Sequence, residues 1–245
     1  MYRSRRTALQ YHPPAAQPSS HRATFAQRPW PFRLWLWGSY QIVGLGLRLL
    51  YRLESEGVEH VPSQGGVVIV SNHISLFDTL VIPYMLLAAQ GVHIVRSPAK
   101  EELFQRSFLG GLLTSWGAFP VRRGKADLRA MRQMRTFMCT EQMMLFPEGT
   151  RSADGRLQAG KRMVGKLIYD TRPVVIPTAI MGTDGLVPAG SSLPRLRTPV
   201  LVRYGRPLDL ERHYALPYTK AAAEAIVQEI MGAIAVLLYN ARSQS

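Results

Sequence analysis

Cysteine is almost absent from this sequence, and motifs that would define other protein classes are missing. The single Cys139 excludes an intramolecular disulfide, and no group of Cys and His residues has the spacing of a zinc site. We therefore expect a chain that folds in a reducing compartment without a structural metal. The Gly-x-Ser-x-Gly turn that presents the nucleophile of many α/β hydrolases is also missing.

Acidic residues are scarce, most of all near the start of the chain. The 245 residues include 30 Lys and Arg but only 16 Asp and Glu, which gives a net charge of +14. Residues 1–53 contain eight Arg, no Lys and no acidic residue, so they supply +8 of this charge. Such an imbalance fits nucleic acid, an anionic membrane surface or anionic substrates as partners. Bulky apolar residues among the later arginines, such as Trp35 and Trp37, favour the membrane, and no nucleic-acid-binding motif accompanies the charge.

Residues 1–29 have the composition of a disordered basic tail. They are rich in Pro, Ser, Gln and Arg, and their apolar residues follow no regular period. An Arg- and Ser-rich start without acidic residues is also typical of an organelle transit peptide. Of these two interpretations we favour the tail, which can lie near lipid headgroups.

Residues 30–53 are predicted to form a membrane-associating helix. The stretch from Leu34 to Leu47 is uncharged and is flanked by Arg33 and Arg48. A spanning helix needs about 20 apolar residues, so a stretch of fourteen favours a helix that lies in the membrane interface. Its Trp and Tyr content suits that position, and we expect it on the cytoplasmic face. The alternative is a helix that packs on the domain's own core.

Residues 54–245 are predicted to form one α/β domain, because strand and helix patterns alternate along them. Short apolar runs predict strands at 65–73, 92–96, 117–121, 143–146, 174–177 and 199–205. Apolar residues at helical spacing predict helices at 76–89, 103–116, 126–140, 160–169 and 219–241. We expect a mixed sheet flanked by helices.

The motif NHISLFD, residues 72–78, lies where the first buried strand passes into a helix. If His73 lies on the turn and Asp78 in the first helical turn, the carboxylate can accept a hydrogen bond from one ring nitrogen. The other nitrogen is then left to act as a base. A histidine that only caps the helix explains the same residues, so this motif alone does not decide between catalysis and structure.

The motif FPEGTRS, residues 146–152, directly follows the apolar strand MMLF. Its Pro and Gly favour a turn that groups a carboxylate, a hydroxyl and a guanidinium: Glu148, Thr150 and Arg151. Ligands bind at strand ends in α/β sheets, and a guanidinium can hold a phosphate through two hydrogen bonds. Further cations are candidates for the same phosphate: Arg122 or Arg123, and Lys161. A solvated turn with an Arg–Glu pair is the alternative.

Taken together, the two motifs resemble those of the glycerolipid acyltransferase family, which includes 1-acylglycerol-3-phosphate acyltransferases. Between them, GAFPVRRG (117–124) resembles the family's Gly-x-Phe-Pro-Val-x-Arg element. After them, VVIPTAIMG (174–182) resembles its fourth, apolar element. All four occur in family order, and the resemblance covers about residues 57–210. It implies an α/β acyltransferase domain, which some members precede with a membrane-binding helical segment.

The resemblance also implies a mechanism. His73 is the general base, and Asp78 orients the base and stabilises its charge. The base removes a proton from the acceptor hydroxyl as that oxygen attacks the thioester carbonyl of acyl-CoA or acyl carrier protein. The expected product is phosphatidate, formed from lysophosphatidate, and no metal or redox cofactor is required.

By the same resemblance, the family's acceptor site corresponds to one arginine and one turn of this sequence. Arg123 matches a phosphate-contacting arginine, and the turn matches at Glu148, Gly149 and Arg151. Thr150 and Lys161 lie close to these positions in the sequence, so we predict that they contact the acceptor too. The position before the family's arginine is often acidic but is Arg122 here, which adds positive charge near the expected phosphate.

Three rival functions are considered. The first is an acyltransferase with another lysophospholipid or an amine-bearing lipid as acceptor. The second is a hydrolase with Ser75 as nucleophile, which the missing nucleophile turn disfavours. The third is a non-catalytic basic module that binds membranes or nucleic acid, which leaves both motifs unexplained.

Overall fold

The structure is a computed structural model, and it describes residues 21–122, 127–186, 195–215 and 217–242. The strands are β1 (Tyr51–Glu56), β2 (Val67–Ser71), β3 (Ser97–Lys100), β4 (Ala118–Val121), β5 (Gln142–Leu145), β6 (Val174–Met181) and β7 (Thr198–Tyr204). The α-helices are α1 (His21–Ala26), α2 (Trp30–Leu50), α3 (Asp78–Gln90), α4 (Ser107–Ser115), α5 (Leu128–Thr140), α6 (Arg162–Thr171), α7 (Glu211–Tyr214) and α8 (Lys220–Arg242). Three 3-10 helices are η1 (Val58–His60), η2 (Glu101–Phe104) and η3 (Thr183–Leu186).

A five-stranded sheet runs through the middle of the molecule in the order β1-β7-β6-β2-β5. Its neighbouring strands are parallel except β6 and β7, which are antiparallel. The sheet is therefore mixed, as predicted. Strands β3 and β4 form a separate parallel pair, which joins the edge of the main sheet through a bridge between Arg96 and Met143.

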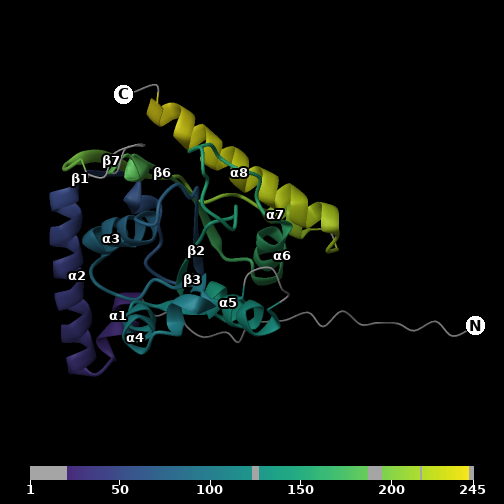
Figure 1. Cartoon of the computed structure of the whole chain (residues 1–245). Coiled ribbons are helices and arrows are strands. Elements are labelled where there is room, and N and C mark those ends of the chain that lie inside the picture. Colours follow the sequence, from purple (N-terminus) through teal and green to yellow (C-terminus); the bar gives the residue numbers. More distant parts are fainter. Residues whose placement is uncertain (1–20, 123–126, 187–194, 216, 243–245) are drawn as a thin grey trace, which may run out of the picture.

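The central strand β2 explains why the sheet is covered on both faces. Its valines and isoleucine are fully buried, and alternate side chains enter opposite cores, as the strand period of two requires. Val67 and Ile69 enter the core covered by α2 and α3. Val68 and Val70 enter the core covered by α5, α6 and α8. Figure 1 shows α2 and α8 on opposite sides of the molecule.

Several predicted boundaries need correction. The predicted membrane-associating helix 30–53 ends at Leu50, because residues 51–53 begin β1, which pairs with β7 from Tyr51 onward. The predicted strand at 92–96 begins later, at Ser97. The predicted disorder of residues 1–29 is wrong for residues 21–26, which form α1, and residues 1–20 lie outside the described chain.

Helix α2 has one buried and one exposed apolar side, so it partly follows the alternative that it packs on the domain's own core. Gly44 lets the helix approach α3, since a Cβ at this glycine would lie 2.5 Å from the ring of Tyr84. Tyr40 stacks on the same ring, with 5.0 Å between the ring centroids. The other side exposes large apolar residues: Trp30, Leu34, Trp35, Trp37, Ile42, Leu45 and Leu49.

The contact between α6 and α8 generates a prediction about stability. A Cβ at Gly165 of α6 would lie 1.9 Å from the carbonyl oxygen of Ala223, so Gly165→Ala must separate the two helices. We expect it to lower the free energy of unfolding by about 1–3 kcal/mol, the usual cost of overpacking. The control is Gly232→Ala in α8, where a Cβ meets nothing within 4 Å. It should raise that free energy by about 0.4–1 kcal/mol. Urea unfolding measures both, and equal stabilities would contradict this packing.

Candidate active site

Asn72 fixes the turn that carries His73 at the end of β2. Its side-chain amide donates to the carbonyl oxygen of Ile180 (2.9 Å), and its side-chain oxygen accepts from the Ile180 N–H (2.9 Å). The side chain thus continues the pairing between β2 and β6 beyond the last paired residues of the main chain. His73 comes next and begins the loop at the carboxyl end of β2, the edge of the sheet where α/β proteins bind ligands.

His73 and Asp78 form the predicted pair. His73 Nδ1 lies 2.9 Å from Asp78 Oδ2, and both side chains are buried. A carboxylate only accepts hydrogen bonds, so Nδ1 carries the proton and Nε2 is left to accept one. The ring of Phe146 stacks on the imidazole, with 3.9 Å between centroids and 12° between planes. These two contacts fix the tautomer and the plane of the ring.

The FPEGTRS loop holds the main chain of His73 on both sides. Glu148 Oε1 accepts from the His73 N–H (3.0 Å), and the His73 carbonyl oxygen accepts from the Ser152 N–H (2.7 Å). Glu148 Oε2 accepts from the Gln158 N–H (3.0 Å). The buried Glu148 carboxylate therefore joins the two motifs, and in this structure it contacts main-chain donors of the protein.

The electrostatics of Glu148 follow from this position. Burial raises the pKa of its carboxyl group above the ordinary value, because a buried charge loses the solvation of water. The N–H groups of Gln158 and His73 oppose this shift, since they stabilise the charged form. Both carboxylate oxygens have a donor, which is what a buried carboxylate requires.

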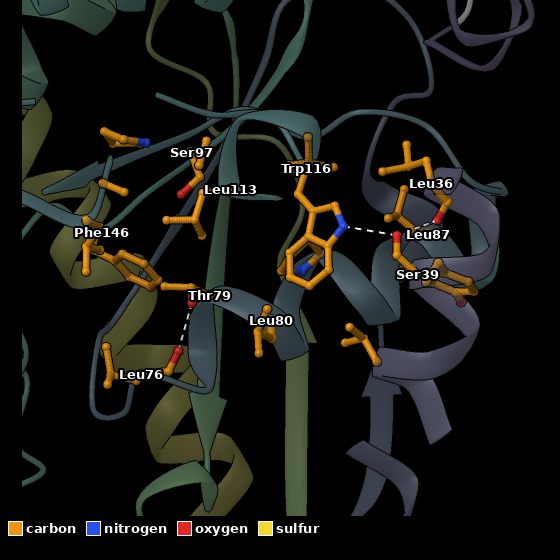
Figure 2. Close-up of a pocket in the computed structure, with 18 of the residues that line it drawn as sticks. Leu36, Ser39, Leu76, Thr79, Leu80, Leu87, Ser97, Leu113, Trp116 and Phe146 are labelled. Atoms are coloured by element: carbon orange, nitrogen blue, oxygen red, sulfur yellow. Dashed lines mark hydrogen bonds between the residues drawn. The ribbon is translucent and has the colours of Figure 1, made fainter. Parts of the chain in front are cut away.

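His73 and Arg151 line a single pocket of about 370 Å³, within the range of small-molecule sites. The rest of the wall is largely apolar and comes from α2, α3 and the segment around β3 and α4. Figure 2 shows Phe146 and Leu76 at one side of the pocket and Leu36 and Ser39 at the other. Trp116 lies between them and donates its indole N–H to the hydroxyl oxygen of Ser39 (3.0 Å). Because His73 stacks on Phe146, the dyad lies at one side of the pocket and α2 at the other.

The predicted acceptor residues surround the turn after β5. Gly149 has φ +75°, which glycine adopts readily, and a Cβ there would lie 3.4 Å from the Cγ of Lys161. Thr150, Arg151 and Lys161 are exposed. Among the described residues, neither cation of this group is paired with a carboxylate, so both can meet an anionic ligand. Arg123 lies outside the described residues.

Arg122 is less available than its position in the sequence indicates. Its Nε lies 2.8 Å from Glu101 Oε2, and both side chains are largely exposed. The charge that Arg122 adds next to Arg123 is therefore partly balanced by a carboxylate from η2.

Sequence reasoning gave no role to four residues that support the dyad: Asn72, Phe146, Ser152 and Thr183. Three of them lie inside the two motifs, so their position next to His73 and Glu148 is the signal that could have found them. Thr183 lies 105 residues from Asp78, to which its hydroxyl donates. No local pattern in the sequence joins these two residues.

A buried His–Asp dyad thus stands at the carboxyl edge of a mixed sheet, beside an apolar pocket and a cationic turn, as in an α/β transferase domain. The sequence model of the acyltransferase family matches residues 52–181, and the chain belongs to this family.

Individual relatives resemble the chain over different lengths. The chloroplastic 1-acyl-sn-glycerol-3-phosphate acyltransferase of Arabidopsis thaliana is 31% identical over 162 residues, which are 64% of this chain and 42% of the relative. The 1-acyl-sn-glycerol-3-phosphate acyltransferase of Limnanthes alba is 30% identical over 192 residues, 75% of this chain and 65% of the relative. The chain therefore spans about two fifths of the Arabidopsis relative and about two thirds of the Limnanthes one.

A solved structure has the same fold. It is the 1-acyl-sn-glycerophosphate acyltransferase of Thermotoga maritima, with a TM-score of 0.62 and 24% sequence identity. The match covers 88% of this chain and 85% of the solved one.

Proposed function

We propose that this protein transfers a fatty acyl group from acyl-CoA or acyl carrier protein to the free hydroxyl of lysophosphatidate, which gives phosphatidate. The observation that carries the proposal is that His73 of the dyad and Arg151 of the cationic turn line one apolar pocket. Such a pocket suits an acyl chain, a hydroxyl to be deprotonated and a phosphate. The relatives named above are 1-acyl-sn-glycerol-3-phosphate acyltransferases, which supports this choice of acceptor.

In the proposed mechanism, His73 Nε2 takes the proton of the acceptor hydroxyl while that oxygen attacks the thioester carbonyl. Asp78 stabilises the imidazolium that forms. The tetrahedral intermediate then collapses, the carbon–sulfur bond breaks, and the thiolate takes the proton from the imidazolium. The acyl group ends as an ester on the acceptor, and no acyl-enzyme forms.

The rival hydrolase mechanism has little support at Ser75. The hydroxyl oxygen of Ser75 accepts from the Phe77 N–H (3.3 Å), and its own N–H donates to Asp78 Oδ2 (2.8 Å). The side chain thus stabilises the turn before α3, whereas a nucleophile must hydrogen-bond to the base.

The membrane is the second proposed partner. An exposed row of large apolar residues on a helix is typical of a surface that meets lipid, and α2 presents one while its other side lines the pocket. The uncharged stretch between Arg33 and Arg48 is about 21 Å long, against a bilayer core of about 30 Å. We therefore propose that α2 lies in the interface at the cytoplasmic face, with its arginines near anionic headgroups.

Helix α8 is the one helix in the described residues that is long and apolar enough to cross a membrane. One side of α8 is buried in the core on one face of the sheet; its buried residues include Ala223, Ile226, Ile230 and Ile234. A helix with this packing is accounted for by the domain itself, so we assign the membrane contact to α2.

The proposed chemistry predicts that His73→Ala lowers kcat by about 10²–10⁴-fold, the usual contribution of a general base. The assay uses purified protein with labelled acyl-CoA or acyl carrier protein and a panel of lysophospholipid and amine-bearing acceptors. Ser75→Ala should keep most of the turnover, because its hydroxyl does not contact the base. If His73→Ala kept more than about a tenth of wild-type turnover, the assignment of the base would be wrong. If the enzyme preferred another acceptor of the panel, the choice of lysophosphatidate would be wrong, but the acyl transfer and its base would stand.

The cationic turn predicts a selective effect on the acceptor. Arg151→Ala should raise the KM for lysophosphatidate about 10- to 100-fold, because a charge-assisted hydrogen bond to the phosphate is lost. The KM for the thioester should change little. Arg156→Ala is the matched control, since that guanidinium is almost fully exposed and lies near Asp154. An equal rise in both KM values would move Arg151 away from the acceptor phosphate.

The exposed face of α2 predicts weaker membrane binding in the double variant Ile42→Glu/Leu45→Glu. These side chains are 75% and 62% exposed, so the substitutions should spare the fold and reduce flotation with vesicles that contain anionic lipid. The control is Val236→Glu on α8, where the side chain is 58% exposed. If Val236→Glu abolished flotation and the double variant did not, the contact would belong to α8.

A further inference from the structure

Thr183 reaches the dyad from β6, the strand that lies next to β2. It is the first residue of η3, just after β6, and only 1% of it is exposed. Its hydroxyl Oγ1 donates to Asp78 Oδ1 at 2.5 Å. The contact therefore connects the end of β6 to the first residue of α3.

The two oxygens of Asp78 have different partners. Oδ2 accepts from His73 Nδ1 (2.9 Å), the Ile74 N–H (2.7 Å) and the Ser75 N–H (2.8 Å). Within the part of the chain that the structure describes, Thr183 is the one side chain that donates to Oδ1. Asp78 is fully buried, so an Oδ1 without a donor would be costly, and the plane of the carboxylate would be held through Oδ2 alone.

The main chain around Thr183 is fixed by two neighbours. The Tyr51 hydroxyl donates to the Thr183 carbonyl oxygen (3.3 Å). Burial, and then the negative charges of Asp78 and Asp184, raise the pKa of Tyr51, so this hydroxyl keeps its proton. Gly182 has φ +86°, and a Cβ there would lie 2.1 Å from the carbonyl oxygen of Pro199. The turn that delivers Thr183 therefore requires glycine.

We propose that Thr183 is a positioning residue for the base His73 and that it acts through Asp78; this proposal rests on the function proposed above. The hydroxyl holds the carboxylate in the plane that His73 Nδ1 requires. It also takes part of the carboxylate's negative charge. Without it, the carboxylate holds the imidazolium more strongly, so the base stays protonated up to a higher pH.

The test compares two substitutions at Thr183 with one nearby. Thr183→Val removes the hydroxyl and keeps the shape, and should lower kcat about 10- to 100-fold, the factor for a hydrogen bond to a charged group. The acid limb of kcat/KM should move to higher pH, while the KM for lysophosphatidate stays within about twofold. Thr183→Ser should restore most turnover and the wild-type profile. The control is Thr178→Val, which removes an equally buried hydroxyl on β6 that donates to the Ile176 carbonyl oxygen. This variant should change neither the turnover nor the pH profile.

The other outcomes overturn the proposal. Wild-type turnover and profile in Thr183→Val would remove Thr183 from the dyad. If Thr183→Ser lost as much turnover as Thr183→Val, the role of Thr183 would lie in the packing of its methyl group. If thermal unfolding shows that the valine variant is misfolded, Thr183→Ala removes the same hydroxyl and is judged by the same measurements.

A measurement without substrate keeps this proposal separate from the proposed function. The imidazole resonances of His73, assigned by comparison with His73→Ala, are followed by NMR from acid to neutral pH. We expect the ring to titrate at higher pH in Thr183→Val than in the wild type and Thr183→Ser. An unchanged titration would refute the positioning role even if the enzyme transfers acyl groups. Absence of acyl transfer by the wild type, with the expected titration shift, would refute the proposed function alone.

Discussion

The buried carboxylate of Asp78 is the point to which the rest of the site is attached. It accepts four hydrogen bonds: from the imidazole of His73, from two main-chain N–H groups of the turn before α3, and from the hydroxyl of Thr183. The turn after β2, the start of α3 and the residue Thr183 after β6 must therefore come together at this one side chain. A fully buried charge is tolerated only when such donors surround it, so the fold and the dyad depend on each other.

The sheet supplies this meeting point. β2 and β6 are parallel neighbours, so their carboxyl ends, which lead to His73 and Thr183, lie at the same edge. The first turn of α3 follows, where the partial positive charge of a helix N-terminus further stabilises the Asp78 carboxylate.

The sequence predicts the local parts of this site and misses the distant ones. His73 and Asp78 are five residues apart, so strand, turn and helix signals are enough to bring them together. The α/β class and most element positions follow from apolar periodicity in the same way. The sequence does not predict β1, because Tyr51–Glu56 has one buried apolar residue, Tyr51, and is otherwise largely charged and exposed. Its partner strand β7 lies 147 residues further along the chain. Thr183 was missed for the same reason, since a hydroxyl donor carries no pattern of its own.

Glu148 has a structural role that the motif alone does not indicate. Its neighbours Thr150 and Arg151 are exposed and can reach a ligand, so the whole turn resembles an acceptor site. The Glu148 side chain, however, points into the protein and accepts from the main chain of His73 and Gln158. One loop therefore combines two tasks, with its buried carboxylate fixing the main chain of His73 and its exposed cation available to an anion. The N–H and the C=O of His73 both bind this loop, so the loop and His73 are held to one another. The positions of the His73 main chain and of the turn that carries Arg151 are thus coupled through this loop.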